Sequence, residues 1–293
     1  MRRVGFLACP GTLPGSSDRR ADAHEHDLQV AALREGFAPA GLELVEIDWR
    51  APESAFDGIE LVLLGTVWDY QDHAERFFAT IEGLAARGIA VCNPPELVRW
   101  NIEKTYLRDL EQAGAPVIPT LWLDDPNGAD IAAAFDYFGC DRLVVKRQVG
   151  AGAEGQMSFD RTAPPSPDWR YGHRAMVQPF LPAIVEEGEY SFVFFDGEFS
   201  HCIRKTAAPG EYRIQSLYGG KEEAIDPPAE DIASAQAVVR AIPGDTPLYA
   251  RIDMIRQDGA LAVMEAELIE PYLYPEQATG FGARMAEAIL KRI

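Results

Sequence analysis

The sequence predicts a mixed α/β (α+β) protein, and three patterns support this fold class. Short apolar segments at 2–8, 42–48 and 59–64 alternate with helical patterns, as in a parallel sheet. A second alternation of strand and helix patterns runs through 117–147. Further on, two apolar runs flank Asp258-Gly259, which predicts an antiparallel hairpin. A chain of 293 residues is long enough for two or three domains, each with its own core.

The first unit, residues 1–100, is predicted to be a parallel α/β domain with helices near 22–38 and 73–87. In such sheets ligands collect beyond the carboxyl ends of the strands, which places them at the loops 10–20 and 65–70. Ordinary packing of the aromatic side chains is the alternative interpretation. The candidates for holding a second substrate are Arg19, Arg20, Trp68, Asp69 and Tyr70.

The second unit, residues 101–182, follows a break between two short helices near Trp100-Asn101, with Lys104 opening the second helix. A strand at 117–123, a helix at 128–138 and a strand at 143–147 come next. The chain has five lysines against 22 arginines, and Lys146 lies inside an apolar strand. A lysine kept in such a place indicates a compact ammonium beside a phosphate.

The stretch from Gly150 to Gly155 formally matches the dinucleotide-binding pattern Gly-x-Gly-x-x-Gly, with Gly152 as its second glycine. That pattern requires a following helix, but here an extended segment leads into Pro164-Pro165. We therefore reject a Rossmann site. The prediction is a mobile glycine loop able to fold its amide groups over phosphates, and a plain surface loop is the alternative.

A strand then runs into a proline-stiffened connector at 175–182, where Gln178, Phe180 and Leu181 are placed to frame an adenine ring. Glu189 follows and suits ribose hydroxyls. The third unit, residues 183–293, is predicted to contain a meander with a hairpin at 196–197, a strand ending in Arg204-Lys205, and a helix near 229–241. The hairpin around 258–259 and a helix from about 276 close it.

The register of the late hairpin decides whether its charged residues meet. Side chains two apart on a strand share a face, so Arg251 lies with Asp253, and Glu265 with Glu267. A two-residue turn alone would leave the two sets on opposite faces. A three-residue loop at 258–260, or an equivalent bulge, sets Asp253 opposite Glu265 and Arg251 opposite Glu267, and we predict that register.

The hairpin is therefore predicted to gather three carboxylates at the rim of a buried sheet, with Leu261 and Val263 continuing the acidic face. The residues expected on the opposite, apolar face are Ala262, Met264, Ala266 and Leu268. Clustered anions are costly unless a cation joins them, and oxygen ligands favour Mg²⁺ or Mn²⁺. A solvated acidic hairpin is the alternative.

Composition narrows the class of ligand. Forty-six acidic against 27 basic residues give a net charge of −19, which argues against nucleic acid and anionic membranes as partners. No apolar stretch approaches the ~20 residues of a membrane span, and we expect a cytoplasmic protein. The four cysteines are far apart without a Cys-x-x-Cys pair, so neither a disulfide framework nor a zinc site is predicted.

The order of these features resembles the ATP-grasp superfamily of carboxylate–amine ligases, of the glutathione synthetase and D-alanine ligase type, over 93–271. The segments 68–70, 100–104 and 264–271 most resemble the D-cycloserine ligase branch. The resemblance implies an ATP-grasp fold in which an N-terminal α/β domain (1–100) precedes a small lid subdomain (101–182) and a C-terminal metal-binding subdomain (183–293).

The resemblance also implies site roles for matching positions. Lys104 and Lys146 would contact ATP phosphates, Lys205 and Arg251 would hold the transferred phosphoryl group, and Glu267 stands where many relatives have asparagine. The remaining implied residues are Gly150, Gly152 and Gly155 for the phosphate lid, Gln178, Phe180, Leu181 and Glu189 for the nucleoside, Arg213 for catalysis, Gly219 and Gly220 for the substrate, and Asp253, Glu265 and Glu267 for two Mg²⁺ ions.

The implied reaction transfers the ATP γ-phosphoryl group to a carboxylate, and an amine or amino-oxy nitrogen then attacks the acyl phosphate. The substrate would be small and amino-acid-like, and the product could be cyclic, as in D-cycloserine formation. A ligase joining amino acids or peptides, a small-molecule kinase and a non-catalytic nucleotide-binding protein are the alternatives. A monomer and a homo-oligomer both stay open.

Overall fold

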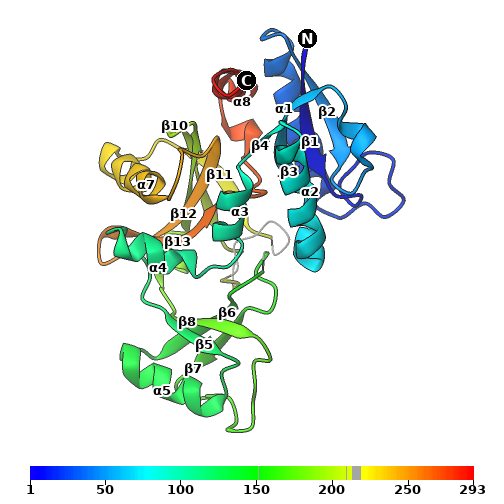
Figure 1. Cartoon of the computed structure of the whole chain (residues 1–293). Helices are drawn as coiled ribbons and strands as arrows, with labels where there is room; N and C mark the ends of the chain where they lie inside the picture. Colours follow the sequence, from blue (N-terminus) through cyan, green and yellow to red (C-terminus); the bar gives the residue numbers. More distant parts are fainter. Residues whose placement is uncertain (151, 209, 213–218) are drawn as a thin grey trace.

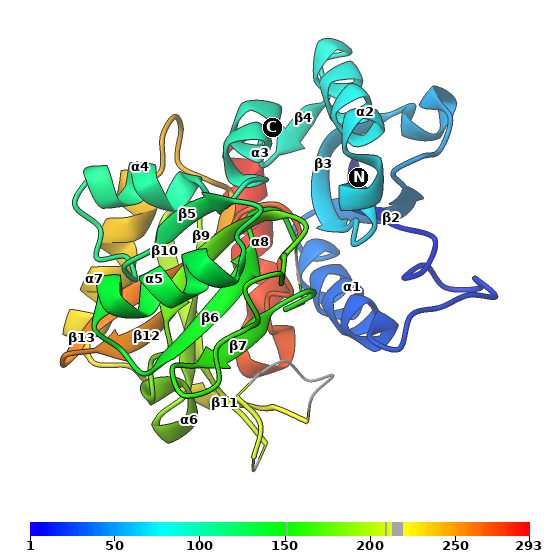
Figure 2. The same cartoon turned by 90° about the horizontal axis from the view of Figure 1, so that it is seen from below.

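Three sheets build the molecule, a computed structural model that describes residues 1–150, 152–208, 210–212 and 219–293. The N-terminal unit, the central sheet and the small lid sheet follow one another down Figure 1, and Figure 2 shows the lid sheet from below with the N-terminal unit beside it. Their arrangement leaves one large cleft where the three units meet. The predicted mixed α/β class is confirmed.

The N-terminal sheet is parallel throughout, with the order β2-β1-β3-β4. Its elements are β1 (Arg2–Ala8), α1 (Ala23–Phe37), β2 (Leu42–Asp48), η1 (Glu53–Phe56), β3 (Ile59–Thr66), η2 (Tyr70–His73), α2 (Ala74–Ala86) and β4 (Ala90–Cys92). Strand β3 is buried along most of its length, because helices cover both faces of the sheet. The loops after β1 and β3 reach the cleft, as the strand pattern predicts.

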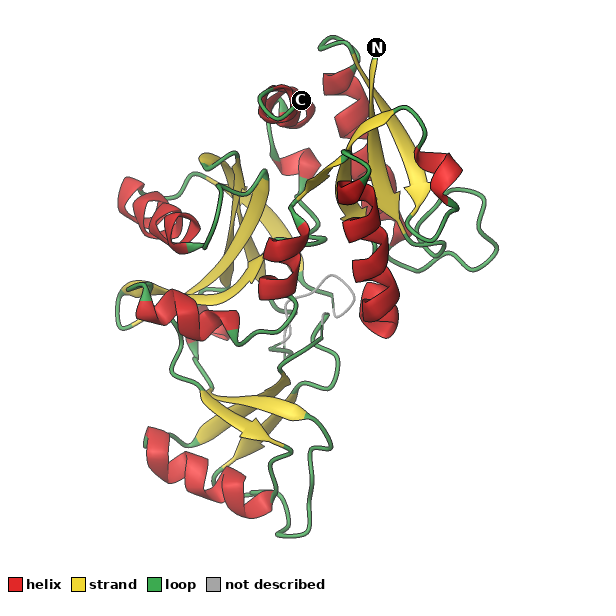
Figure 3. Ribbon diagram, viewed as in Figure 1, coloured by secondary structure: helices red, strands yellow, loops and turns green. Residues whose placement is uncertain are grey.

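The lid sheet is antiparallel, with the order β5-β8-β6-β7. Its elements are β5 (Leu121–Asp124), α5 (Gly128–Phe138), β6 (Arg142–Arg147), β7 (Met157–Asp160) and β8 (Arg174–Pro179). Apolar residues of α5, β6 and β8 form its core on one face, and Figure 3 shows α5 against that outer face. Alternate residues of β6 and β8 therefore face the cleft.

The central sheet is antiparallel, with the order β11-β10-β9-β12-β13. Its elements are β9 (Glu189–Phe195), β10 (Glu198–Thr206), β11 (Lys221–Ile225), α7 (Ala229–Ala241), β12 (Tyr249–Gln257) and β13 (Ala260–Glu267). Helix α7 packs on one face together with α3 (Pro95–Asn101) and α4 (Tyr106–Gln112). Its other face carries the charged residues of the cleft.

The predicted register of the late hairpin is confirmed, but by a bulge rather than a longer loop. Asp253 lies opposite Glu265 and Arg251 opposite Glu267, while a two-residue turn at Asp258-Gly259 pairs the strands next to it. The register shifts by one residue between Asp253 and Met254. The inserted residue in β13 thus produces the pairing of Asp253 with Glu265 that was expected from a three-residue loop.

The same bulge makes the prediction for the faces of β13 wrong at its turn end. Leu261 and Val263 pack with Ala266 and Leu268 in the core under α7. Ala262 and Met264 pack in a separate cluster beside the connector at Phe180 and Leu181. One extra residue reverses the alternation of the side chains along a strand, which pattern reading alone does not reveal.

The bulge is stabilised by a segment that was predicted as part of a strand. Val263 donates its amide hydrogen to the Pro116 carbonyl at 2.7 Å, and Ile118 donates to the Val263 carbonyl at 3.4 Å. Strand β5 begins only at Leu121, because Pro119 lacks an amide hydrogen for the ladder. The predicted strand at 117–123 is therefore shorter and shifted.

The closing helix returns to the beginning of the chain. Helix α8 (Phe281–Leu290) lies beside α1, with η4 (Pro275–Gln277) and the short α6 (Ala183–Glu186) completing the fold. A Cβ atom on Gly36 would lie 2.0 Å from the Gly282 backbone, so the two helices touch through glycines. The helix starts later than the predicted residue 276, after Gly280 at positive φ.

Candidate active site

A cleft of 650 Å³ lies between the lid sheet, the charged face of the central sheet and the N-terminal loops. Nearly all of the predicted nucleotide and metal residues line it: Lys104, Lys146, Gly150, Gly152, Gln178, Phe180, Leu181, Glu189, Lys205, Arg251, Asp253, Glu265 and Glu267. Among the predicted substrate residues, Trp68, Asp69 and Tyr70 line the same cleft. Sequence positions almost 200 residues apart thus meet in one place.

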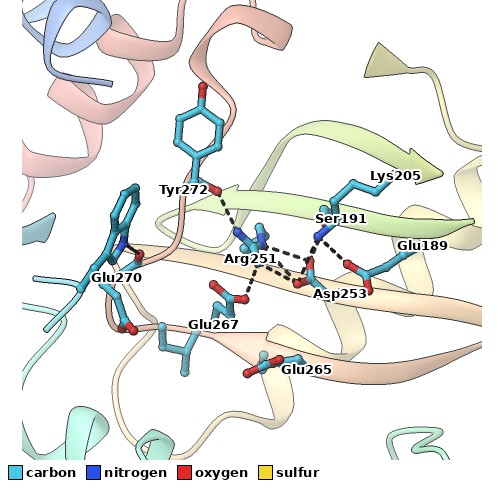
Figure 4. A network of polar contacts seen from close by, with 12 residues as sticks. Glu189, Ser191, Lys205, Arg251, Asp253, Glu265, Glu267, Glu270 and Tyr272 are labelled. Carbon is cyan, nitrogen blue, oxygen red and sulfur yellow. Dashed lines mark hydrogen bonds and ion pairs between the residues drawn. The ribbon is translucent and has the colours of Figure 1, made fainter. Parts of the chain in front are cut away.

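A charged network occupies the centre of the cleft wall (Figure 4). Arg251 donates to both oxygens of Asp253, from Nε to Oδ1 at 3.0 Å and from Nη2 to Oδ2 at 2.9 Å. Ser191 donates its hydroxyl to the same carboxylate at 2.5 Å. Lys205 pairs with Glu189 and lies 3.6 Å from Asp253. Although burial opposes the charged form, Arg251 and Lys205 hold the pKa of Asp253 at about 2.

The three predicted metal ligands share this face, and each is paired with a side-chain cation. Glu265 binds Lys104, Glu267 binds Arg251, and Asp253 binds Arg251 and Lys205. Burial, together with the charges of Asp253 and Glu265, raises the pKa of Glu267 to about 7 despite Arg251. Burial of closely spaced carboxylates thus favours the protonated form of Glu267.

The donor set is chemically suited to Mg²⁺, because all three side chains offer carboxylate oxygens. In the residues that the structure describes, no three acidic, histidine or cysteine side chains stand close enough together to hold a metal ion. Arg251 lies between Asp253 and Glu267, which explains their separation. Their role as metal ligands therefore stays a prediction.

Two lysines approach the cleft from different elements. Lys104, in the turn before α4, donates to the Gly150 carbonyl at 2.9 Å and also to the Glu265 carboxylate. It thereby connects the glycine loop to the carboxylate face of the central sheet. Lys146, on β6, forms no side-chain hydrogen bond or ion pair in the described part of the chain, and burial lowers its pKa. An unpaired ammonium directed into a cleft is suited to an anionic ligand.

The glycine loop joins β6 to β7 without a helix, which confirms that no Rossmann site is present. Gly150, Gly152 and Gly155 all have positive φ. Arg147 lies under the loop and pairs with Glu154 at 2.8 Å. Gly155 lies outside the lining of the cleft, and Ala151 lies outside the described residues.

The connector after β8 forms the far end of the cleft. Gln178 is buried and donates to Thr120 Oγ1 at 2.9 Å, which fixes its side chain. The Phe180 ring lies under Arg142, whose guanidinium carbon is 4.1 Å from the ring centre. The Phe180 amide is already bonded to the Arg142 carbonyl, so an adenine could pair only with the remaining backbone groups of this connector.

The N-terminal loops supply the opposite wall, with one of the two candidate arginines. Arg20 lies over the Trp68 ring, 5.5 Å from its centre, and lines the cleft beside Asp22. Arg19 instead donates to Thr12, Ala23 and Asp27 and lies away from the cleft. The guanidinium of Arg19 thus holds the loop onto α1, and its contact with a substrate stays a prediction that this position does not support.

Two further predicted residues that the structure describes do not line the cleft. Gly219 and Gly220 lie just before β11, outside its lining. Arg213 lies outside the described residues.

Two tyrosines at the cleft were missed by sequence reasoning. Tyr272 and Tyr274 follow β13 and line the cleft, with ring centres 4.8 Å apart. Lys205 and Arg251 lie 5.8 and 5.6 Å from the centre of the Tyr274 ring. Alternation along a strand gave no reliable signal for them, because Tyr274 has left-handed backbone angles and the strand ends at Glu267.

Comparison with known proteins agrees with this geometry. A sequence profile described as the N-terminal domain of the D-cycloserine synthetase DcsG matches residues 4–93. The chain is 28% identical over 285 residues to the cycloserine biosynthesis protein DcsG of Streptomyces lavendulae, covering 91% of this chain and 94% of that protein. It is 24% identical over 255 residues to a glutathione synthetase of Photorhabdus laumondii subsp. laumondii, covering 81% and 78%.

The crystal structure of D-cycloserine synthetase DcsG superposes with a TM-score of 0.79, at 24% identity and 99% coverage of both chains. A D-alanine–D-alanine ligase from Bacillus anthracis complexed with ATP gives a TM-score of 0.65, at 18% identity, covering 99% of this chain and 97% of that one. The chain has the ATP-grasp fold. The predicted resemblance to ATP-grasp ligases near the D-cycloserine branch is thereby confirmed.

An ATP-grasp ligase, PsnB, in complex with a minimal precursor, Mg and ADP gives a TM-score of 0.62, at 16% identity, covering 99% of this chain and 97% of that one. The matched ATP-grasp structures thus include complexes with ATP and with Mg and ADP. Within the described residues, no helix is both long and apolar enough to cross a bilayer.

Proposed function

We propose that this chain is an ADP-forming ligase that joins the carboxylate of a small amino-acid-like substrate to a nitrogen through an acyl phosphate. The observation that carries the proposal is the meeting of Lys205 and Arg251 with three carboxylates in a cleft roofed by the glycine loop. Phosphoryl transfer needs mainly position and positive charge, and this wall provides both.

Each group of residues that lines the cleft would have its own role in the reaction. Lys104 and Lys146 would bind the ATP phosphates, and Lys205 with Arg251 would hold the phosphoryl group in transit. Asp253, Glu265 and Glu267 would hold Mg²⁺, which when bound neutralises charge on the phosphates. Gln178, Phe180, Leu181 and Glu189 would form the nucleoside end.

The glycine loop would act as a lid in this scheme. Among the described residues, Lys104 ties it to the carboxylate face through the Gly150 carbonyl, and release of this contact would let the loop close when nucleotide arrives. Closure would exclude water from the acyl phosphate, which otherwise hydrolyses. No nucleophilic side chain is required.

The similarity to DcsG extends the proposal to a cyclising reaction in which carboxylate and nucleophile belong to one molecule. Joining of two amino acids, as in the glutathione synthetase type, uses the same ATP half and is the alternative. The two differ at the N-terminal wall, where Arg20, Trp68, Tyr272 and Tyr274 would contact the substrate.

The test is release of ADP and phosphate, screened across D- and L-amino acids, O-ureido-serine and dipeptides with Mg²⁺ and ATP. We expect equal ADP and phosphate with one group of amino acids, and a large loss in the Asp253→Asn and Lys146→Ala variants. ADP without free phosphate would identify a kinase. If both variants turn over at the wild-type rate, the assignment of Asp253 and Lys146 to the active site is wrong.

A further inference from the structure

Glu270 differs from the neighbouring carboxylates of the cleft. Asp253, Glu265 and Glu267 each form an ion pair with Arg251 or Lys104. Glu270 also lines the cleft, but within the described residues its carboxylate forms no ion pair with a side-chain cation. In Figure 4 its side chain points away from the Arg251 network, and no dashed line reaches its carboxylate.

The position of Glu270 is fixed by its backbone. The Trp68 indole donates to the Glu270 carbonyl at 3.0 Å, and Pro271 restricts the next peptide. Tyr70 is buried nearby, and after burial itself the charge of Glu270 is the largest cause that raises the pKa of Tyr70. Glu270 therefore stands where the N-terminal wall meets the end of β13.

This place lies on the substrate side of the proposed phosphoryl site. The candidate substrate residues Trp68 and Tyr70 come from the N-terminal loops, whereas the nucleotide residues come from the lid and the central sheet. A partly buried carboxylate without a partner is unfavourable, and a ligand that brings a positive charge would relieve it. The low-dielectric surroundings would make that ion pair stronger than one in water.

We propose that Glu270 is the counter-ion for the ammonium group of the amino-acid-like substrate and thereby selects amines over uncharged analogues. The inference rests on the proposed function, because it assigns a substrate group to the same cleft. Glu270 is in this view a specificity-determining residue that contacts substrate, separate from the carboxylates predicted to hold Mg²⁺.

The experiment compares the amino acid selected by the ADP-release screen with the hydroxy acid of the same skeleton, in wild type and in Glu270→Gln. Glutamine keeps the size of the side chain and removes its charge. We expect kcat/KM for the amino acid to fall by about 10- to 100-fold, mainly through KM, as for loss of one charged hydrogen bond. The hydroxy acid should change by less than about 2-fold, and the KM for ATP should stay constant.

Asp72→Asn is the matched control, because Asp72 is an exposed acid at the same cleft and its loss changes the net charge equally. It should leave the preference for the amino acid intact. Glu222 of β11 is another acid that lines the cleft. Three results would overturn the inference: equal losses for both acids in Glu270→Gln, a shift of the Mg²⁺ requirement instead of the substrate preference, or loss of the preference in Glu222→Gln but not in Glu270→Gln. If the wild-type protein releases no ADP with any acid, the proposed function itself fails, which is a distinct outcome.

Discussion

At the scale of single residues, the cleft contrasts paired and unpaired charges. Arg251, Asp253 and Lys205 are paired in a buried network, whereas Lys146 forms no side-chain ion pair within the described residues. When one partner of a buried ion pair is removed, the other charge is left uncompensated, and the fold is strongly destabilised. A buried charge without an ion-pair partner lowers stability, and such charges often serve to bind a ligand. Stability and function can therefore be separated residue by residue.

Lys146→Ala provides the first test of that separation. We expect ATP affinity to fall by about 10- to 100-fold, because a charged contact to phosphate is lost. The free energy of unfolding without nucleotide should not decrease, because no ion pair is broken. Calorimetric titration and urea unfolding measure the two quantities, with Lys221→Ala on the exposed edge strand as control. A large loss of stability would show that Lys146 supports the fold.

At the scale of elements, helices α1 and α8 contact each other through glycines. A Cβ atom on Gly282 of α8 would lie 2.1 Å from the Ala32 carbonyl oxygen of α1. The backbone cannot yield as a flexible side chain could, so the helices must separate to admit a methyl group. Gly83 in α2 has no atom within 4 Å of such a position.

Gly282→Ala should therefore destabilise the protein by about 1 to 3 kcal/mol, as overpacking does. Gly83→Ala makes the same chemical change in an open helical position and should stabilise by about 0.5 to 1 kcal/mol. Thermal or urea unfolding of the two variants, side by side with wild type, gives the comparison. Equal effects of the two substitutions would refute the close-packing explanation.

Elements were predicted best where the pattern is local. The helix at 229–241 and the strands at 2–8 and 42–48 match the prediction, because each needs only its own apolar spacing. The faces of β13 were not predictable, because Met264 enters a bulge that pairs with a distant segment around Pro116. Short-range patterns contain no information about such a partner.

The site was predictable to the extent that order along the chain reveals it. Lys104, Lys146, Arg251 and Asp253 were identified from motif order, and they meet in one cleft. Arg19 and Arg20 are adjacent in the sequence, and only the path of the loop decides which one faces the cleft.

At the scale of the whole molecule, a few buried polar side chains hold the units together. Asn93 donates to the carbonyls of Tyr249 and Leu268 at 2.9 and 2.7 Å and accepts from the Leu248 amide at 2.8 Å. Gln29 of α1 accepts from the Leu273 amide at 2.9 Å. Nε2 of His201 lies 2.9 Å from the Leu273 carbonyl, to which it donates in the neutral tautomer.

His201 makes the stability of the molecule depend on pH. Burial lowers its pKa from 6.5 to about 4, so the unfolded chain binds a proton between these values that the folded protein does not bind. Stability should therefore fall as pH decreases from 6.5 to 4, by about 3 kcal/mol from this group. Urea unfolding across this range should show the dependence reduced in His201→Gln and unchanged in the exposed His24→Gln. A slope equal to that of wild type in His201→Gln would assign the acid sensitivity to other groups.

The contact of α8 with α1 has a consequence for the order of events during synthesis. Residues of α8 cover the apolar side chains Val30, Leu33 and Phe37 of α1. The apolar core around α1 is therefore complete only after residues 281–290 have been translated. We expect a nascent chain of this protein to expose part of that apolar surface to chaperones until α8 docks.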